Sequence, residues 1–587
     1  MPSFEDLRYA IRRRVRRGRY VLEDASYAAR RSVRRATSGA RGSWSGFTLR
    51  TRYRIAGALV VLALVAAIAL IAVPDLPCGW PGGGECVPDD EAIALVPGDS
   101  TAYVHVVTAR SAEQYEQAEA LAERFPTVIQ QVVDRLPAPR GAAFDYQRDV
   151  APWLGGEAAL ALVPAGGGEP RATVLLEVGG ESGASRFVER IAGRDPETES
   201  HDGVEVRLAG RGLAVAVVGG FVVAGPEAQV IRVIETEAGG HPLGDSAPAN
   251  EVLDALPDLR LAELYVSEDG ADELLAPGRP LGSLEAFVNA EATVGAGAAL
   301  VAKDDALELE IHSALDPERA ENAPGFFAAF PSFEPALAGA LSEGALAYLA
   351  LGDPERSIAD LLGQATAEAP AIAAGFEDVV ERVRKAGGVN LERQVLPLLT
   401  SQATVAVEPT RAGGAAIAGV PFVSLIVDEV DEERARRALA ELQVPIAKAL
   451  DPSTSLQAPV FKQEEIDGVE ARSLRISPAV ELTYAIVDGR LVISTDPEGV
   501  RRVAGGDGSL DDSDRFEDAT EGLPDDVSAL LYLNLGGLLG LAEQAGLGED
   551  PAYALFAEEF RKLEGLGLAV RSGEDEIDTT IRVSVGG

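Results

Sequence analysis

The chain repeats a short stretch of its own sequence, because AYVHV at residues 102–106 returns as AYLAL at residues 347–351. Further matches follow in the same order, at an offset that grows from 245 to about 270 residues. Such order and spacing indicate internal duplication. We therefore predict two homologous ectodomain repeats, residues 92–317 and 335–587. The matched polar and glycine positions are Arg148/Arg393, Asp202/Asp467, Glu205/Glu470, Asp258/Asp525, Gly295/Gly565 and Gly297/Gly567.

Short strands bounded by glycine dominate each repeat, for example residues 157–163, 173–178, 204–208, 213–218 and 221–224. Asp488-Gly489 predicts a hairpin turn, and residues 298–302 with 306–311 predict another hairpin. Predicted helices such as 185–191 and 432–442 lie between strands. Short connections favour antiparallel pairing. The predicted fold class is therefore α+β, with each repeat a largely antiparallel sheet and helices packed on one face.

An apolar stretch precedes the repeats, IAGALVVLALVAAIALIAV at residues 55–73. As a helix it would be about 28 Å long, close to the hydrocarbon core of a bilayer at ~30 Å. A cleavable signal peptide has a shorter apolar core and a small-residue cleavage site, and a buried soluble helix is usually amphipathic. A lipoprotein signal would place small residues before the cysteine, where this chain has Asp75-Leu76-Pro77 before Cys78. We predict a transmembrane helix that acts as an uncleaved signal-anchor.

The charge on the two sides of this helix is opposite. Residues 1–54 hold 15 Arg, no Lys and 4 acidic residues, a net charge of +11, whereas the whole chain carries −41. Residues 74–587 therefore carry −52. Lys and Arg are retained on the cytoplasmic side of a membrane. We predict a single-pass protein of the cell membrane with a cytoplasmic N-terminus and an extracytoplasmic C-terminal ectodomain.

The basic tail, residues 1–54, repeats YAIRRRVRR at residues 9–17 as YAARRSVRR at residues 27–35. Eighteen residues are five helical turns, so both copies would share one helix face. Such a helix could lie on anionic lipid, where each basic residue contributes about 1 kcal/mol. Two alternatives stay open: a solvated tail that only fixes topology, and an arginine-rich arm that binds nucleic acid or a protein. For the acidic ectodomain we expect no nucleic-acid binding.

The segment 74–91 is a Pro/Gly linker that contains Cys78 and Cys86, the two cysteines of the chain. In an oxidising compartment this spacing predicts a local disulfide. Two cysteines without a nearby histidine are too few for a structural zinc site.

Catalytic motifs are absent from the sequence, which has no H-E-x-x-H, G-x-S-x-G or P-loop. The four histidines, His105, His201, His241 and His312, are scattered, and we expect structural roles for them. The acidic run from Asp507 to Asp514 could bind calcium, but its spacing is not that of an EF-hand. We favour a loop that ends at the N-cap of a helix containing Phe516. We therefore predict no catalytic, cofactor-binding or metal-binding residues.

The stretch LVPGDSTAYVHV at residues 95–106, together with the basic tail, single anchor and repeated ectodomain, resembles a bacterial family. This family is known as domain of unknown function 3352. The resemblance covers the chain beyond the anchor, and it implies no catalytic residues and no defined activity.

These features predict a non-catalytic module at the cell envelope that binds a ligand or scaffolds other envelope proteins. Two related units side by side would create a cleft of the kind that ligands use. The alternative is an envelope hydrolase with a carboxylate pair, because such a pair leaves no local sequence motif.

The predicted topology is tested with a reporter that is active only in the cytoplasm, fused after Gly587. We expect no reporter activity, because the Arg-rich tail retains the N-terminus inside. The same reporter fused before residue 55 should be active. Activity of the C-terminal fusion in the cytoplasm would contradict the orientation.

Overall fold

The computed structural model describes residues 90–129, 146–165, 168–193, 196–210, 212–275, 285–322, 330–355, 394–399, 401–410, 421–450, 460–477, 480–505 and 509–586. The predicted tail, the predicted transmembrane helix and residues 74–89 of the linker lie outside these residues, as do Cys78 and Cys86. Within the described residues, no helix combines the length and apolar character that crossing a membrane requires.

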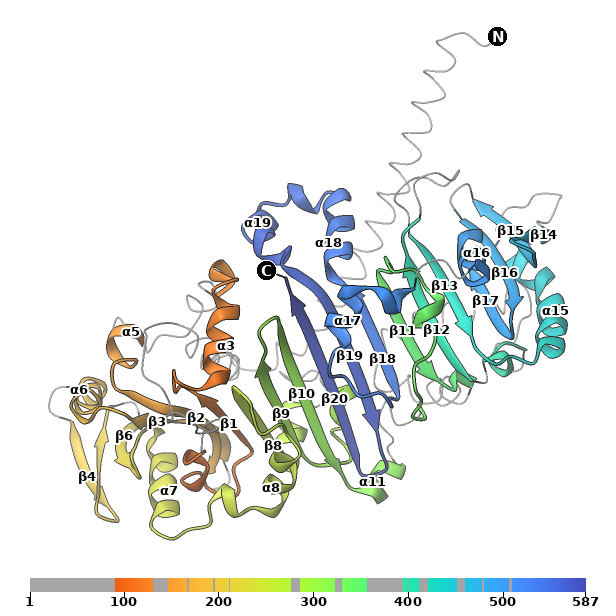
Figure 1. Ribbon diagram of the computed structural model, residues 1–587. Helices are drawn as coiled ribbons and strands as arrows, with labels where there is room; N and C mark the ends of the chain where they lie inside the picture. The colour runs from red at the N-terminus through yellow and green to blue at the C-terminus, as the bar shows by residue number, and fades with distance from the viewer. Residues whose placement is uncertain are drawn as a thin grey trace, which may run out of the picture.

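In the part of the chain that the structure describes, twenty strands form one antiparallel sheet (Figure 1). The first ten strands lie in the order β4-β5-β6-β7-β3-β2-β1-β8-β9-β10. Their bounds are β1 (Ala102–Val107), β2 (Leu154–Ala165), β3 (Gly168–Val178), β4 (Glu197–His201), β5 (Val204–Leu208), β6 (Leu213–Val218), β7 (Phe221–Pro226), β8 (Ala262–Ser267), β9 (Thr293–Ala302) and β10 (Ala306–Leu315).

The second ten strands lie in the order β14-β15-β16-β17-β13-β12-β11-β18-β19-β20. Their bounds are β11 (Ala347–Gly352), β12 (Gln402–Glu408), β13 (Phe422–Val427), β14 (Lys462–Ile466), β15 (Val469–Ser477), β16 (Val480–Val487), β17 (Arg490–Ser494), β18 (Ala529–Asn534), β19 (Leu563–Ser572) and β20 (Glu576–Val585). The antiparallel sheet and mixed helix–strand content agree with the predicted fold class.

Strands β10 and β20 join the two halves of the sheet at its centre, a junction that we call the seam (Figure 1). Their register runs from Ala306 opposite Ser584 to Ala314 opposite Glu576. Charged and polar side chains also meet across the seam, among them Arg582 and Asp305 at 3.5 Å. Arg582 contacts Glu308, and His312 Nδ1 lies 2.7 Å from Asp578 Oδ1.

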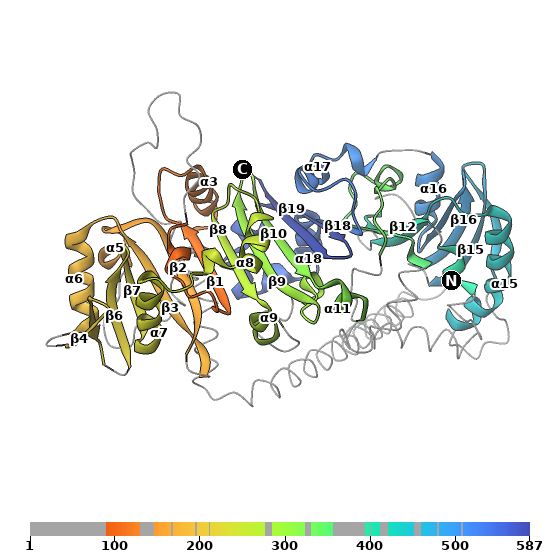
Figure 2. The same ribbon diagram turned by 90° about the horizontal axis from the view of Figure 1, so that it is seen from below.

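Helices cover both faces of the sheet, so the prediction of helices on one face is wrong. In the first half, α7 (Glu227–Glu237) and α8 (Ala247–Asp254) pack on one face, in a core that contains Val230, Val252 and Phe221. On the other face, α6 (Glu181–Ala192) packs Phe187 against Val222, which alternates with Phe221 along β7. Figure 2 shows α6 and α7 on opposite sides of these strands.

The second half has the same two-sided cover. Helices α16 (Pro497–Gly505) and α17 (Asp514–Thr520) contribute to one core, and α15 (Glu432–Leu450) contributes to another. Among the described residues, the remaining helices of four or more residues are α3 (Glu113–Ala122), α5 (Tyr146–Asp149), α9 (Glu268–Leu274), α10 (Glu285–Val288), α11 (Pro317–Asn322), α18 (Leu535–Gln544), α19 (Pro551–Ala554) and α20 (Ala557–Phe560).

Asp-Gly pairs form the tight turns between neighbouring strands. Asp488 and Gly489 have positive φ values of 47° and 79°, as a type I′ turn requires, so the predicted hairpin at residues 487–490 is confirmed. Asp202-Gly203 and Asp467-Gly468 have the same backbone geometry between β4 and β5 and between β14 and β15. Asp202 and Asp467, which the repeat aligns, are therefore turn residues.

The seam can be tested with Arg582→Ala. The Arg582 side chain is 4% exposed, and it also reaches Glu521 Oε2 at 2.6 Å and donates from Nε to the Asp518 carbonyl oxygen at 2.7 Å. Its removal leaves the largely buried Glu308 carboxylate with the half-exposed Lys303, 3.6 Å away, as a weaker cationic partner. This loss should lower the free energy of unfolding by about 3 kcal/mol. Urea unfolding followed by circular dichroism measures the loss.

Arg571→Ala is the matched control, because Arg571 pairs with Asp578 in the adjoining strands while its side chain is 51% exposed. The control should cost only about 0–1 kcal/mol. Equal midpoints for wild type and Arg582→Ala would contradict the role of the seam.

Candidate functional site

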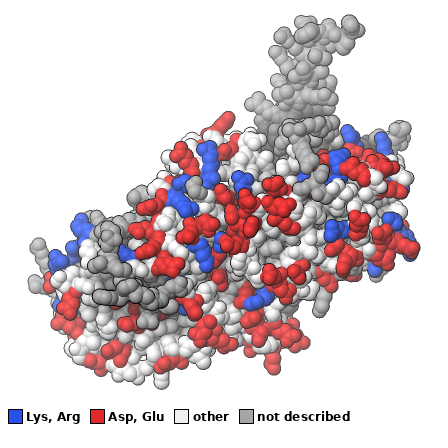
Figure 3. Space-filling model, in the orientation of Figure 1, with Lys and Arg blue, Asp and Glu red and all other residues white. Residues whose placement is uncertain are grey.

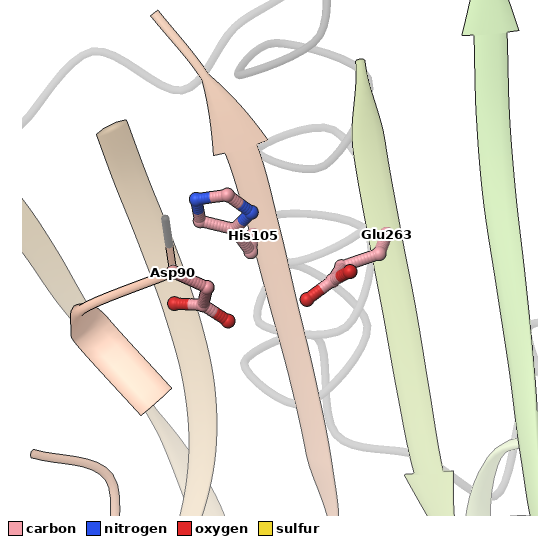
Figure 4. Close-up of side chains that lie close together, drawn as sticks. All are labelled: Asp90, His105 and Glu263. Carbon is pink, nitrogen blue, oxygen red and sulfur yellow. The ribbon is translucent and has the colours of Figure 1, made fainter. Parts of the chain in front are cut away.

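A histidine and three carboxylates lie together on neighbouring strands of the first half. Figure 4 shows three of the four residues, His105, Asp90 and Glu263. His105 is on β1, Glu157 on β2 and Glu263 on β8, and Asp90 precedes the short helix η1 (Ala92–Ala94). Antiparallel pairing of β1 with β8 places Glu263 directly opposite His105. We call these four residues the His105 cluster.

Distances within the His105 cluster are short. His105 Nε2 lies 3.0 Å from Glu157 Oε2. One potential ligand atom from each of Asp90, His105 and Glu263 lies within 4.8 Å of the other two. His105, Glu157 and Glu263 are buried, each with 3–4% of its surface exposed. Figure 4 shows the His105 ring above the carboxylates of Asp90 and Glu263.

Each carboxylate of the cluster is also held from outside. The Tyr103 hydroxyl donates to Asp90 Oδ1 at 2.6 Å, and the Glu91 amide donates to Glu157 Oε1 at 3.1 Å. The Arg260 guanidinium contacts Glu263 Oε2. These contacts fix the carboxylate positions. Glu157 Oε2 faces His105 Nε2, and Asp90 Oδ2 is buried without a hydrogen-bond donor.

Burial and neighbouring charges shift the pKa values here. Burial raises the pKa of Glu263 above its usual 4.5, although the positive charges of Arg260 and His105 oppose the shift. Burial alone would lower the pKa of His105, but contact with Glu157 and the negative charges of Asp90 and Glu263 outweigh it, so the pKa is raised. Burial first and Asp90 second raise the pKa of Tyr103.

A second buried carboxylate, Glu408 at the end of β12, is 1% exposed. Arg502 Nη1 lies 3.1 Å from Glu408 Oε2, and the Ser342 amide donates to the same oxygen at 3.0 Å. Burial nevertheless dominates and raises the pKa of Glu408. Glu263 and Glu408 are thus carboxyl groups with raised pKa values that lie beneath the surface, where a bulky substrate does not reach them.

A surface groove of about 450 Å³ lies between α15 and strands β15 and β16. Its polar lining consists of Arg436, Gln443, Glu470, Arg472 and Tyr484. Glu470 is the single carboxylate among the described residues that line it, and it pairs with Arg472 at 3.1 Å. The groove therefore has polar groups that could hold a ligand, but it has no carboxylate pair from the described residues.

The other histidines lie apart from the His105 cluster. His201, at the end of the outer strand β4, is 3.4 Å from Glu235 Oε1, and His241 is exposed in a turn. His312 is in the seam. The sequence predicts four scattered histidines. It carries no local sign that His105 meets residues 15 positions before it and 52 and 158 positions after it.

The acidic run from Asp507 to Asp514 is described from residue 509 onward. The predicted helix containing Phe516 is α17, which begins at Asp514 after Ser513, but the Ser513 side chain makes no capping hydrogen bond. The Phe516 and Glu517 amides donate to the Ser513 carbonyl oxygen instead. Burial first and the neighbouring Asp512 second raise the pKa of Asp511.

The chain belongs to the family described as "Protein of unknown function (DUF3352)", which it matches over residues 55–582. The predicted family is therefore confirmed. No curated protein matches the sequence.

Among solved structures, crystal form I of TP0453 is similar over 39% of this chain and 79% of that one, with 11% identity and a TM-score of 0.24. Crystal form III of TP0453 gives 10% identity and the same TM-score. Similarity at this level does not define a function.

Glu408→Gln tests whether the buried Glu408 carboxyl lowers the stability of the fold at neutral pH. A carboxyl whose pKa is raised by folding stabilises the fold below its unfolded pKa, near 4.5, and this contribution is lost as pH rises through the folded pKa. We expect wild type to lose stability relative to Glu408→Gln as pH rises from 4.5. Urea unfolding across that range measures the difference.

Glu470→Gln, which replaces a carboxylate whose side chain is 64% exposed, controls for the amide substitution itself. A stability difference between wild type and Glu408→Gln that stayed constant with pH, or moved in the opposite direction, would refute the assignment.

Proposed function

We propose that this protein is a non-catalytic binding or scaffolding module of the cell envelope, held at the membrane by residues 55–73. In this proposal the N-terminus is cytoplasmic, the ectodomain is extracytoplasmic, and the arginine-rich tail rests on anionic lipid. Cys78 and Cys86 form a disulfide that stiffens the linker. The charge asymmetry and the apolar run support this arrangement.

The observation that carries the proposal is the burial of two carboxyl groups with raised pKa values, Glu263 and Glu408. A hydrolase of the carboxylate type needs two accessible acids about 5–10 Å apart in a cleft. Glu263 and Glu408 are instead closed off by strands and by arginine partners. The groove beside α15 is open, and its described lining offers two arginines and one carboxylate. This chemistry suits binding better than general acid catalysis.

The surface supports a partner of basic character. Figure 3 shows Asp and Glu side chains over much of the visible face, with Lys and Arg in smaller groups. Residues 74–587 carry a net charge of −52, so the ectodomain repels anionic polymers and attracts cations and basic protein surfaces.

We also infer that the two halves are copies of one unit. Their strand orders correspond strand for strand, and the buried cross-strand pair Tyr103–Tyr265 corresponds to Tyr348–Tyr532. Gly297 lets α8 approach β9, because a Cβ there would lie 2.6 Å from Val252. Its counterpart Gly567 lets α17 approach β19 in the same way.

An approximate two-fold axis relates these copies. His312 on β10 lies opposite Gly297, and Arg582 on β20 lies opposite Gly567, the counterpart of Gly297. Residues of β10 and β20 therefore correspond at an offset of 270. In the seam Glu310 faces Thr580, its own counterpart, and the pair Glu308–Arg582 corresponds to Asp578–His312. Two related faces on one continuous sheet suit a scaffold that holds two partners, or one partner with two-fold symmetry.

Cross-linking in intact cells, followed by identification of the captured proteins, tests the proposal. We expect a stable envelope partner whose capture weakens as salt rises, because the attraction is electrostatic. Turnover assays on envelope glycans and peptides run beside it with wild type, Glu263→Gln and Glu408→Gln. Turnover that either substitution abolishes would establish the hydrolase instead.

A further inference from the structure

We propose that Asp90, His105 and Glu263 bind a divalent transition-metal ion, for which Zn²⁺ is the best fit. This inference goes beyond the proposed function and does not depend on it. One imidazole nitrogen and two carboxylates form a mixed donor set that suits zinc, whereas Mg²⁺ and Ca²⁺ favour oxygen ligands alone.

The geometry of the cluster is that of ligands turned toward a common point. Ligand atoms of the three residues lie within 4.8 Å of one another, which allows one ion to reach all of them at bond lengths near 2.0–2.2 Å. Figure 4 shows the His105 ring with one nitrogen on the side of Glu263 and Asp90 below the ring. Asp90 Oδ2 is buried and has no hydrogen-bond partner.

The surroundings resemble the outer contacts of a metal site. Metal-binding histidines usually have their second ring nitrogen beside a carboxylate, and metal-binding carboxylates usually accept a further hydrogen bond. Glu157 Oε2 lies 3.0 Å from His105 Nε2, which leaves Nδ1 for the ion. Tyr103 donates to Asp90, and Arg260 contacts Glu263.

The charge of the cluster favours a divalent ion. Three carboxylates against the single guanidinium of Arg260 leave two negative charges when His105 is neutral, as a ligand must be. One divalent cation neutralises this excess. Without it, the cluster has to retain protons in a buried setting.

The fold itself does not require the cluster. In the second half, the position of His105 on β1 is taken by Ala350 on β11, and the residue opposite it is Leu530 instead of Glu263. Both are buried, and the same strand pairing forms. Four polar residues gathered in only one half therefore indicate a ligand. Because Asp90 lies within the predicted linker, the ion would tie the linker to the sheet.

A metal-binding measurement on the full chain in detergent tests this site. The protein is stripped with a chelator and dialysed against Zn²⁺, and bound zinc is counted by mass spectrometry. We expect one zinc ion per wild-type chain, and its loss in His105→Ala, which copies Ala350, and in Glu263→Gln. His312→Ala is the matched control, because His312, Glu576 and Asp578 form the other described group of metal-ligating type, and it should retain the ion.

Two further readouts use properties other than stoichiometry. Zinc should raise the unfolding temperature of wild type and of His312→Ala but not of Glu263→Gln. X-ray absorption of the zinc-loaded wild type should show one imidazole with oxygen ligands and no sulfur, and this readout needs no variant to fold. Absence of stoichiometric zinc in wild type, sulfur ligation, or full binding by His105→Ala would overturn the proposal.

Discussion

The pairing of β10 with β20 is the constraint on which the rest of the structure depends. Each of these strands is ten residues long, and unpaired it would present a row of free N–H and C=O groups that invites aggregation. By pairing, the two strands close each other's edge. The outer edges of the sheet are then β4 and β14. Each is five residues long, and their sequences, ETESH and KQEEI, are mostly charged and polar. Short polar edges resist further pairing.

Local rules predicted the hairpins and much of the sheet. The Asp-Gly turns need positive φ at both central residues, which the sequence reveals directly, and the predicted strands at residues 204–208 and 213–218 match β5 and β6. The strand β4 was missed because ETESH has no apolar alternation. Helix α15 continues past its predicted end at residue 442, and through Pro445, because packing of its apolar face outweighs the lost hydrogen bond.

Local sequence rules could not predict the His105 cluster, because its residues come from four separate segments of the chain. One signal was available. Tyr103 and Tyr265 each follow a similar turn, and if their strands pair antiparallel with the tyrosines opposite, then His105 must face Glu263. Nothing in the sequence states that pairing. Asp90 also lies within the predicted linker, and nothing in the sequence around it indicates that its side chain contacts the sheet.

Hydrogen–deuterium exchange of the β10 and β20 amides in the full chain tests the continuous sheet most directly. Amides of these strands that point across the seam should exchange as slowly as those of β1 and β11, because each donates to the opposite half. Exchange of those amides at the rate of the outer strand β4 would show that the halves do not pair. That result would contradict the single sheet and the two-fold arrangement built on it.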